Sequence, residues 1–201
     1  MYLMKNVEQY APQFFPVKNP PMRWASKTMI EKAPVWCSVD LRDGNQALIT
    51  PMNLEEKLEF FRYLVKIGFK EIEIGFPAAS ETEYEFCRTL IENDMIPDDV
   101  TIQVLTQARD PLILRTFEAL RGARRATVHL YNATAPLFRE LVFGMDKAEV
   151  IALATRATRL IRQQCEQQPE TRWQYEYSPE TFCFTEPEFA LEICEAVADV
   201  W

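Results

Sequence analysis

From Val35 onward, short runs rich in β-branched and aromatic residues alternate with longer runs of helical periodicity, five times over. The connections are too long for hairpins, so consecutive strands are expected to be parallel, with right-handed crossovers through the helices. This alternation restricts the chain to an α/β fold built on a parallel sheet. The predicted strands are residues 36–41, 70–75, 100–105, 124–131 and 172–178.

Capping patterns, together with the helical spacing of apolar residues, predict where the helices begin. Four times, a residue able to cap a helix stands three positions before a glutamate, which is typical of a capping box. Leu54 and Phe61 share a helical face, and Gly68 then predicts a stop. Asp110-Pro111 predicts a start with proline at the first helical position. The four capping pairs are Asn53–Glu56, Ser80–Glu83, Asp146–Glu149 and Thr185–Glu188.

Two fold classes accept this pattern: a flavodoxin-like doubly wound sheet and a TIM (β/α)8 barrel. Five units slightly favour the open sheet, since a barrel needs eight units and about 250 residues. The strand faces favour the barrel, because doubly wound strands are covered on both sides and are apolar throughout. Here Glu71 and Glu73 alternate with isoleucines, and the fourth and fifth strands alternate similarly. We therefore predict the first five β/α units of a TIM barrel, with a polar interior face.

Residues 1–34 differ from the rest of the chain. Prolines stand at positions 12, 16, 20, 21 and 34, with aromatic residues between them. This composition predicts an extended arm that lies on a surface. We expect an N-terminal arm at 1–34 and an incomplete barrel domain at 35–201.

Composition excludes several classes of protein. The chain has 201 residues, with 22 basic and 30 acidic side chains and a formal charge of −8, a poor match to nucleic acid or anionic membranes. It has neither a signal-peptide pattern nor an apolar stretch of roughly 20 residues. Its five cysteines form an odd set without a C-x-x-C pair. We expect a cytoplasmic protein with neither nucleic-acid nor membrane partners.

One polar cluster follows the first predicted strand directly, in the segment Asp40–Gln46. Barrel enzymes place their sites at the carboxyl ends of strands. Asp43 offers hard oxygen ligands for Mg²⁺ or Mn²⁺, and Arg42 offers a fork for a carboxylate or an enolate oxygen. A polar turn with a local salt bridge is the alternative.

Further candidates belong to the other strands. Glu73 needs a partner if it is buried, and Arg42 is the obvious one. His129, the only histidine, stands on the polar face of the fourth strand, where a structural hydrogen bond is the alternative role. Ser178 and Glu180 close the fifth strand; Glu180 is an acid–base candidate, with a solvated loop glutamate as the alternative. No Gly-rich phosphate loop is present, and no local signature supports a Ser/His/Asp triad.

Four segments of the chain, residues 35–48, 71–80, 128–134 and 175–180, form a combination of motifs. Together they resemble the 2-isopropylmalate synthase family, and Arg23–Lys27 is similar to its N-terminal arm. The motif L-R-D-G-x-Q alone marks only the wider DRE-TIM/HMGL-like metallolyase superfamily, which includes homocitrate and citramalate synthases and hydroxymethylglutaryl-CoA lyase.

The resemblance implies a TIM-barrel acyltransferase that catalyses a Claisen-type condensation. Acetyl-CoA and 2-oxoisovalerate would give 2-isopropylmalate and CoA, the first step of leucine biosynthesis, with a divalent metal ion (Mg, Mn or Zn) and a homodimeric full-length protein. A sister condensing enzyme of the homocitrate or citramalate type is one alternative. A non-catalytic remnant that binds an intact synthase is the other.

The same resemblance implies roles for seven side chains. Asp43 would bind the metal, Arg42 would stabilise negative charge on the oxo acid or enolate, and Glu180 would transfer a proton. The remaining substrate-binding positions would be Glu73, Gln46, His129 and Ser178.

The family's His-x-His pair, a further asparagine and its leucine-sensing domain have no counterpart before Trp201. We therefore expect the chain alone to be inactive, with two open sheet edges and uncovered apolar surface that favour self-association.

Overall fold

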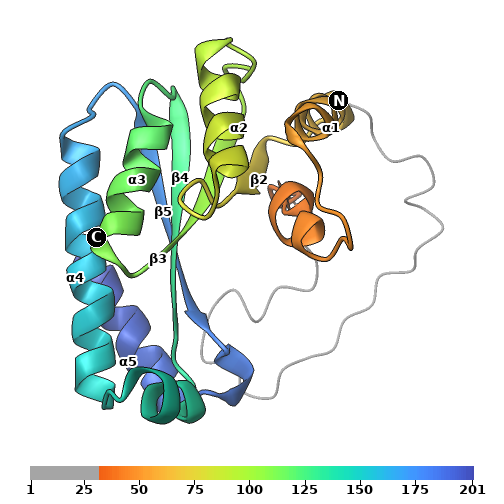
Figure 1. The fold of residues 1–201 in the computed structure, drawn as a ribbon. Helices are drawn as coiled ribbons and strands as arrows, with labels where there is room; N and C mark the ends of the chain where they lie inside the picture. The colour runs from red at the N-terminus through yellow and green to blue at the C-terminus, as the bar shows by residue number, and fades with distance from the viewer. Residues whose placement is uncertain (1–31) are drawn as a thin grey trace. The chain divides into compact units, whose positions relative to one another are not determined.

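The computed structural model describes residues 32–201, and the predicted arm at 1–34 lies almost wholly outside that range. Five parallel strands form one sheet in the order β1-β2-β3-β4-β5 (Figure 1). A doubly wound sheet reverses its strand order, whereas this sequential order is that of a TIM barrel. The strands are β1 (Cys37–Ser38), β2 (Glu71–Gly75), β3 (Thr101–Gln107), β4 (Arg125–Ala133) and β5 (Arg172–Glu180).

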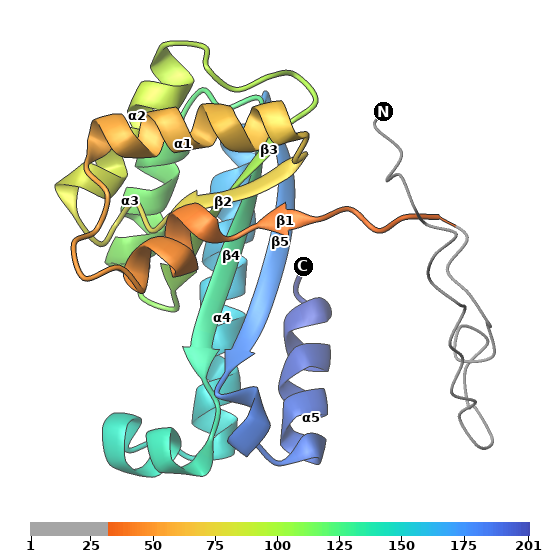
Figure 2. The same ribbon diagram turned by 90° about the vertical axis from the view of Figure 1, so that its right-hand side faces the viewer.

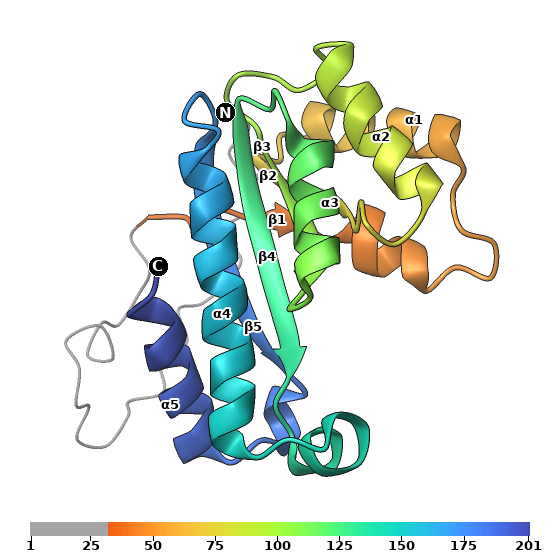
Figure 3. The same ribbon diagram turned by 60° about the vertical axis from the view of Figure 1, so that its left-hand side comes forward.

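Helices connect the strands along one face of the sheet. In Figure 2, α4 lies behind β4 and β5, and Figure 3 shows α3 and α4 in front of the strands. None of the helices within residues 32–201 is long and apolar enough to cross a membrane. The helices are α1 (Leu54–Ile67), α2 (Glu81–Glu92), α3 (Asp110–Leu120), α4 (Lys147–Glu166) and α5 (Pro187–Ala198).

The two faces of the sheet differ as the alternation predicts. Ile72, Ile102 and Val128 are fully buried, and they belong to the same core as Phe61 of α1 and Phe117 of α3. Burying a side chain of this size contributes roughly 1.5–3 kcal/mol. The opposite face of the central strands is polar, and it carries the candidate site.

Two of the predicted capping boxes are confirmed. Asn53 Oδ1 accepts from the Glu56 amide at 2.9 Å, while the Glu56 carboxylate accepts from the Asn53 amide at 2.9 Å. Asp146 and Glu149 make the same reciprocal pair at 2.8 Å on α4. Gly68 ends α1 in the left-handed conformation, as predicted.

Two helix starts differ from the prediction. Glu186 stands at the N-cap position of α5 without a side-chain capping bond, and Pro187 lies in the first turn, while the Thr185 hydroxyl donates to the Thr181 carbonyl instead. Helix α3 begins at Asp110 with Arg109 as its cap, which places the proline one position later than predicted.

The predicted box at Ser80 and Glu83 is half formed. Ser80 caps α2, but the Glu83 carboxylate turns away from the cap and pairs with Lys57 of α1. Its second oxygen accepts from the Phe76 amide at 3.2 Å. Lys57 is fully buried, so its ammonium needs this carboxylate. The pair ties α1 and α2 to the turn that follows β2.

Candidate functional site

The turn after β1 positions the first group of candidate side chains. The prediction of a strand over 36–41 is wrong beyond Ser38, because the chain winds into a π-helix, η3 (Asp40–Gly44). Three consecutive amides, from Arg42 to Gly44, donate to the Val39 carbonyl at 2.9–3.2 Å. Leu41 anchors the turn in the core. The turn therefore displays its polar side chains on the polar side of the sheet.

Arg42 and Glu73 form the ion pair predicted from the sequence. Arg42 Nε and Nη2 both lie 2.9 Å from Glu73 Oε2. Glu73 is completely buried, and burial alone raises the pKa of a carboxyl group. The hydrogen bond from His129 and the positive charge of Arg42 outweigh that effect, so the pKa of Glu73 lies below its usual value. Glu73 is thus an ionised carboxylate inside the protein.

His129 connects Glu73 to β5. Its Nδ1 lies 2.8 Å from Glu73 Oε1, and its Nε2 lies 2.7 Å from Ser178 Oγ. Two further groups approach the imidazole, Gln103 Nε2 at 3.4 Å from Nδ1 and Glu176 Oε1 at 3.4 Å from Nε2. Polar side chains from β2, β3, β4 and β5 thus meet on one face of the sheet.

A hollow of about 340 Å³ opens beside this network. Its lining comes from the turn after β1 and from the carboxyl halves of β3, β4 and β5. This is the end of the strands where barrel enzymes place their sites. Six of the seven predicted site residues line it: Arg42, Asp43, Gln46, His129, Ser178 and Glu180.

Glu73 is the predicted site residue that does not line the hollow. Conversely, Leu105 and Tyr131 line it but were not predicted. Tyr131 stands two positions after His129 and Leu105 pairs with His129 across the strands, so both belong to the polar face. The alternation of side chains along the strands could have predicted both positions. Neither an apolar nor a phenolic side chain is by itself typical of a catalytic or metal-binding site.

A second, smaller hollow of about 80 Å³ adjoins the first. Tyr131 and Glu180 line both. Arg109 and Phe143 contribute a cation and an apolar surface to the smaller one. Glu180 is thus an exposed carboxylate that contributes to the lining of both hollows.

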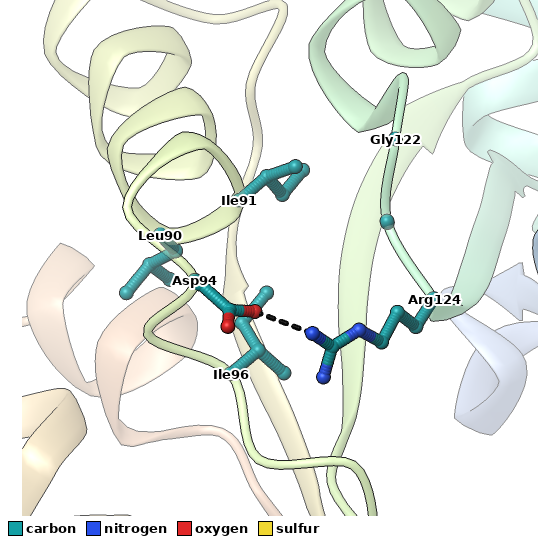
Figure 4. A pocket seen from close by; sticks show the side chains of 7 residues that line it. Leu90, Ile91, Asp94, Ile96, Gly122 and Arg124 are labelled. Atoms are coloured by element: carbon teal, nitrogen blue, oxygen red, sulfur yellow. Dashed lines mark hydrogen bonds and ion pairs between the residues drawn. The ribbon is translucent and has the colours of Figure 1, made fainter.

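A third hollow, of about 30 Å³, lies near the opposite end of the strands (Figure 4). Leu90 and Ile91 line it, and Asp94 and Arg124 face one another across it at 2.7 Å. Arg124 also pairs with Asp98. These charges satisfy one another at an exposed position, as in an ordinary surface ion pair.

The matching family model describes HMGL-like proteins, and it covers residues 33–200. The chain belongs to the HMGL-like family. Proteins of this family typically use a divalent metal ion.

Several proteins named 2-isopropylmalate synthase are similar to nearly the whole of this chain. A 2-isopropylmalate synthase of Pseudomonas fluorescens is 62% identical over 188 residues, covering 93% of this chain and 34% of the relative. One from Pseudomonas savastanoi pv. phaseolicola is 56% identical over the whole chain, and one from Desulfitobacterium hafniense is 58% identical over 98% of it. These matches cover 36% and 35% of those two relatives. The chain thus spans about a third of the length of the relatives that it matches.

The rim of the hollow supplies part of a ligand set of the kind that a divalent cation prefers, namely carboxylate oxygens. The Asp43 side chain is 63% exposed and its carboxylate is 3.0 Å from Arg42 Nη1, so one hard oxygen is accessible. Glu180 adds an exposed carboxylate across the hollow. Within residues 32–201, no three His, Cys, Asp or Glu side chains are gathered as a ligand cluster.

Cys37 adjoins the polar network without being a nucleophile. Burial, followed by the negative charge of Glu73, raises the pKa of its thiol to about 11. A thiol with that pKa is protonated at neutral pH, and the thiolate is the reactive form.

Proposed function

We propose that the protein to which this chain belongs is a 2-isopropylmalate synthase. One observation carries the proposal: a cation, two carboxylates, an imidazole and a hydroxyl line a single hollow at the carboxyl ends of the strands. The high identity to 2-isopropylmalate synthases supports the choice of substrates, acetyl-CoA and 2-oxoisovalerate. The methyl group of the acetyl thioester would lose a proton, its carbon would bond to the keto carbon, and the keto oxygen would take up a proton to become a hydroxyl group. Water would then cleave the thioester, giving a carboxylate and free CoA.

Arg42 is proposed to stabilise negative charge on the oxo acid and on the enolate. Its fork is fixed by Glu73 on one side and by Asp43 on the other. A donor held in place before the reaction does not have to reorganise as charge develops, which is the main source of electrostatic catalysis.

The other lining residues are proposed to bind the oxo acid. His129, Ser178 and Gln46 offer hydrogen bonds to its oxygens, since all three side chains line the hollow. Leu105, which is almost fully buried, offers apolar surface for the branched alkyl group. The oxygens of the oxo acid would thus contact the polar residues of the hollow, and its branched alkyl group would contact Leu105.

Asp43 is proposed to hold a divalent ion of Mg, Mn or Zn. Such an ion, when bound, would act as a Lewis acid on the substrate oxygens. Glu180 is proposed to transfer the proton, because its carboxylate is exposed and contributes to the lining of both hollows.

The test is CoA release by the whole product of the gene, supplied with acetyl-CoA and one of three oxo acids. We expect the highest kcat/KM with 2-oxoisovalerate, and lower values with pyruvate and 2-oxoglutarate. Preference for another oxo acid would identify a sister condensing enzyme. Absence of CoA release with any of them would contradict the proposal. The 201-residue chain alone is expected to be inactive, because one exposed aspartate and one glutamate are too few ligands for a catalytic ion.

Asp43→Ala is expected to lower metal-dependent turnover by orders of magnitude. Asp94→Ala is the matched control, since Asp94 is also an exposed aspartate paired with an arginine, but it lies at the third hollow. Equal activity of the two variants would remove Asp43 from the site.

We further propose a cytoplasmic homodimer for the whole protein. The resemblance to the synthases supports this, and sedimentation of the whole gene product tests the dimer.

A further inference from the structure

Glu73 has no atom free for a substrate. Its side chain is completely buried, and it does not line the hollow. Oε2 receives two N–H groups of Arg42, and Oε1 faces Nδ1 of His129. Its influence on the site must therefore pass through these two neighbours.

The ionised carboxylate determines which nitrogen of His129 carries the proton. A carboxylate can only accept, so Nδ1 at 2.8 Å must donate to it. A hydrogen bond from Gln103 Nε2 would require Nδ1 to be an acceptor instead. This amide group is uncharged, however, and it lies farther from Nδ1, at 3.4 Å. The shorter, charge-assisted bond is the stronger of the two. In the neutral imidazole, Nε2 is then the acceptor that faces Ser178.

We propose that Glu73 is a positioning residue that orients the Arg42 fork and selects the Nδ1–H form of His129, so that Nε2 faces Ser178 and the hollow. The order hydroxyl, imidazole, carboxylate is the one found in serine hydrolases, where the acid orients the ring and fixes its tautomer. The inference deepens the proposed function and rests on it for the effect on turnover, but the tautomer itself is a property of this chain.

Nitrogen NMR on the 201-residue chain tests the tautomer directly. His129 is the only histidine, so ¹⁵N-labelled protein made without a histidine tag gives one imidazole. We expect Nδ1 to be protonated in the wild type. If the neutral imidazole of the wild type instead carries its proton on Nε2, the inference is overturned. This test uses the wild-type chain alone.

Glu73→Gln is expected to move the proton to Nε2. Arg42 has only donors, so the amide oxygen of the glutamine must face it. The amide NH₂ is then left facing His129, and Nδ1 can only accept from it. A variant that folds and keeps Nδ1 protonated would contradict the proposal.

Glu176→Gln is the matched control. It makes the same change from carboxylate to amide beside the other ring nitrogen, 3.4 Å from Nε2. Because the Glu73 contact stays in place, the proton should remain on Nδ1. A shift of the proton to Nε2 in this variant as well would show that Glu73 does not select the tautomer.

Kinetics of the whole gene product supply the second readout. Glu73→Gln should lower kcat/KM for the oxo acid by about tenfold to a hundredfold, the usual effect of losing a partner that orients a functional side chain. Glu73→Asp, which retains the charge, should recover part of the loss. If the tautomer changes as expected but no oxo acid is condensed, the proposed function fails and the positioning role stands. If condensation proceeds and Glu73→Gln leaves the tautomer unchanged, the positioning role fails alone.

Discussion

At the scale of single residues, Glu73 couples the site to the stability of the protein. Its pKa is lower in the folded chain than the ordinary value of 4.5, since the bond from His129 and the charge of Arg42 together outweigh burial. A group with a depressed folded pKa contributes stability that is fully present above its unfolded pKa. This contribution is lost as the pH falls through the folded pKa.

Glu73→Gln should therefore make the free energy of unfolding depend less on pH at acidic pH. We expect the variant to unfold with about 2 kcal/mol less free energy at neutral pH, because charge-assisted bonds are lost. The difference from wild type should shrink as the pH falls below about 4.5. Urea unfolding at several pH values measures this, with Glu59→Gln on the exposed side of α1 as control. A constant difference across the range would show that Glu73 does not carry the effect.

Glu180 offers a second prediction at this scale. Glu180→Gln retains the shape of the side chain but removes the carboxylate that is proposed to transfer the proton. We expect kcat to fall by about 10²–10⁴-fold with little change in KM for the oxo acid. Steady-state kinetics of the whole gene product measure both, and Glu188→Gln, on the exposed surface of α5, is the control. An unchanged kcat would assign the proton transfer to another group.

At the scale of secondary structure, the end of β2 depends on one glycine. Gly75 has a φ of +152°, which side chains rarely adopt. A Cβ at this position would lie 1.7 Å from Glu83 Oε2. Glu83 is held by Lys57 and by the Phe76 amide, so moving it would leave a buried ammonium without its partner.

Gly75→Ala should destabilise the chain by about 3 kcal/mol, from backbone strain combined with the damaged ion pair. Gly144→Ala is the control for a positive φ without a steric contact, because Gly144 has a φ of +60° and nothing lies within 4 Å of its added Cβ. That control should lose only about 1 kcal/mol. Comparable losses in urea unfolding would show that the Lys57–Glu83 pair does not hold the turn.

The elements also show where sequence reasoning succeeds and where it fails. The partner of Glu73 was predictable, because a buried carboxylate needs a cation and Arg42 was the nearest one along the sheet. The π-helix after β1 was not predictable, since it depends on the Val39 carbonyl receiving three amides in the folded turn. The Glu83 side chain left its predicted box for Lys57, a partner 26 residues away that periodicity does not reveal.

At the scale of the whole molecule, the described sheet has two edges, β1 and β5. Unpaired strand edges readily associate with other chains. Beside the β5 edge, the short turn η5 (Phe182–Phe184) exposes two aromatic rings, at 62% for Phe182 and 80% for Phe184. An open edge next to exposed aromatic side chains is a favourable place for contacts between copies.

We therefore expect the 201-residue chain to self-associate as its concentration rises. Phe182→Asp with Phe184→Asp should shift it toward monomer, because two negative charges replace the apolar rings beside the β5 edge and repel their copies. Leu114→Asp with Leu191→Asp is the matched control, since it adds the same charge at exposed leucines of α3 and α5. Sedimentation velocity over a wide concentration range measures the difference. A monomer at every concentration with one cooperative unfolding transition would contradict the expectation, and equal shifts in both variants would mean that net charge, rather than the β5 edge, controls association.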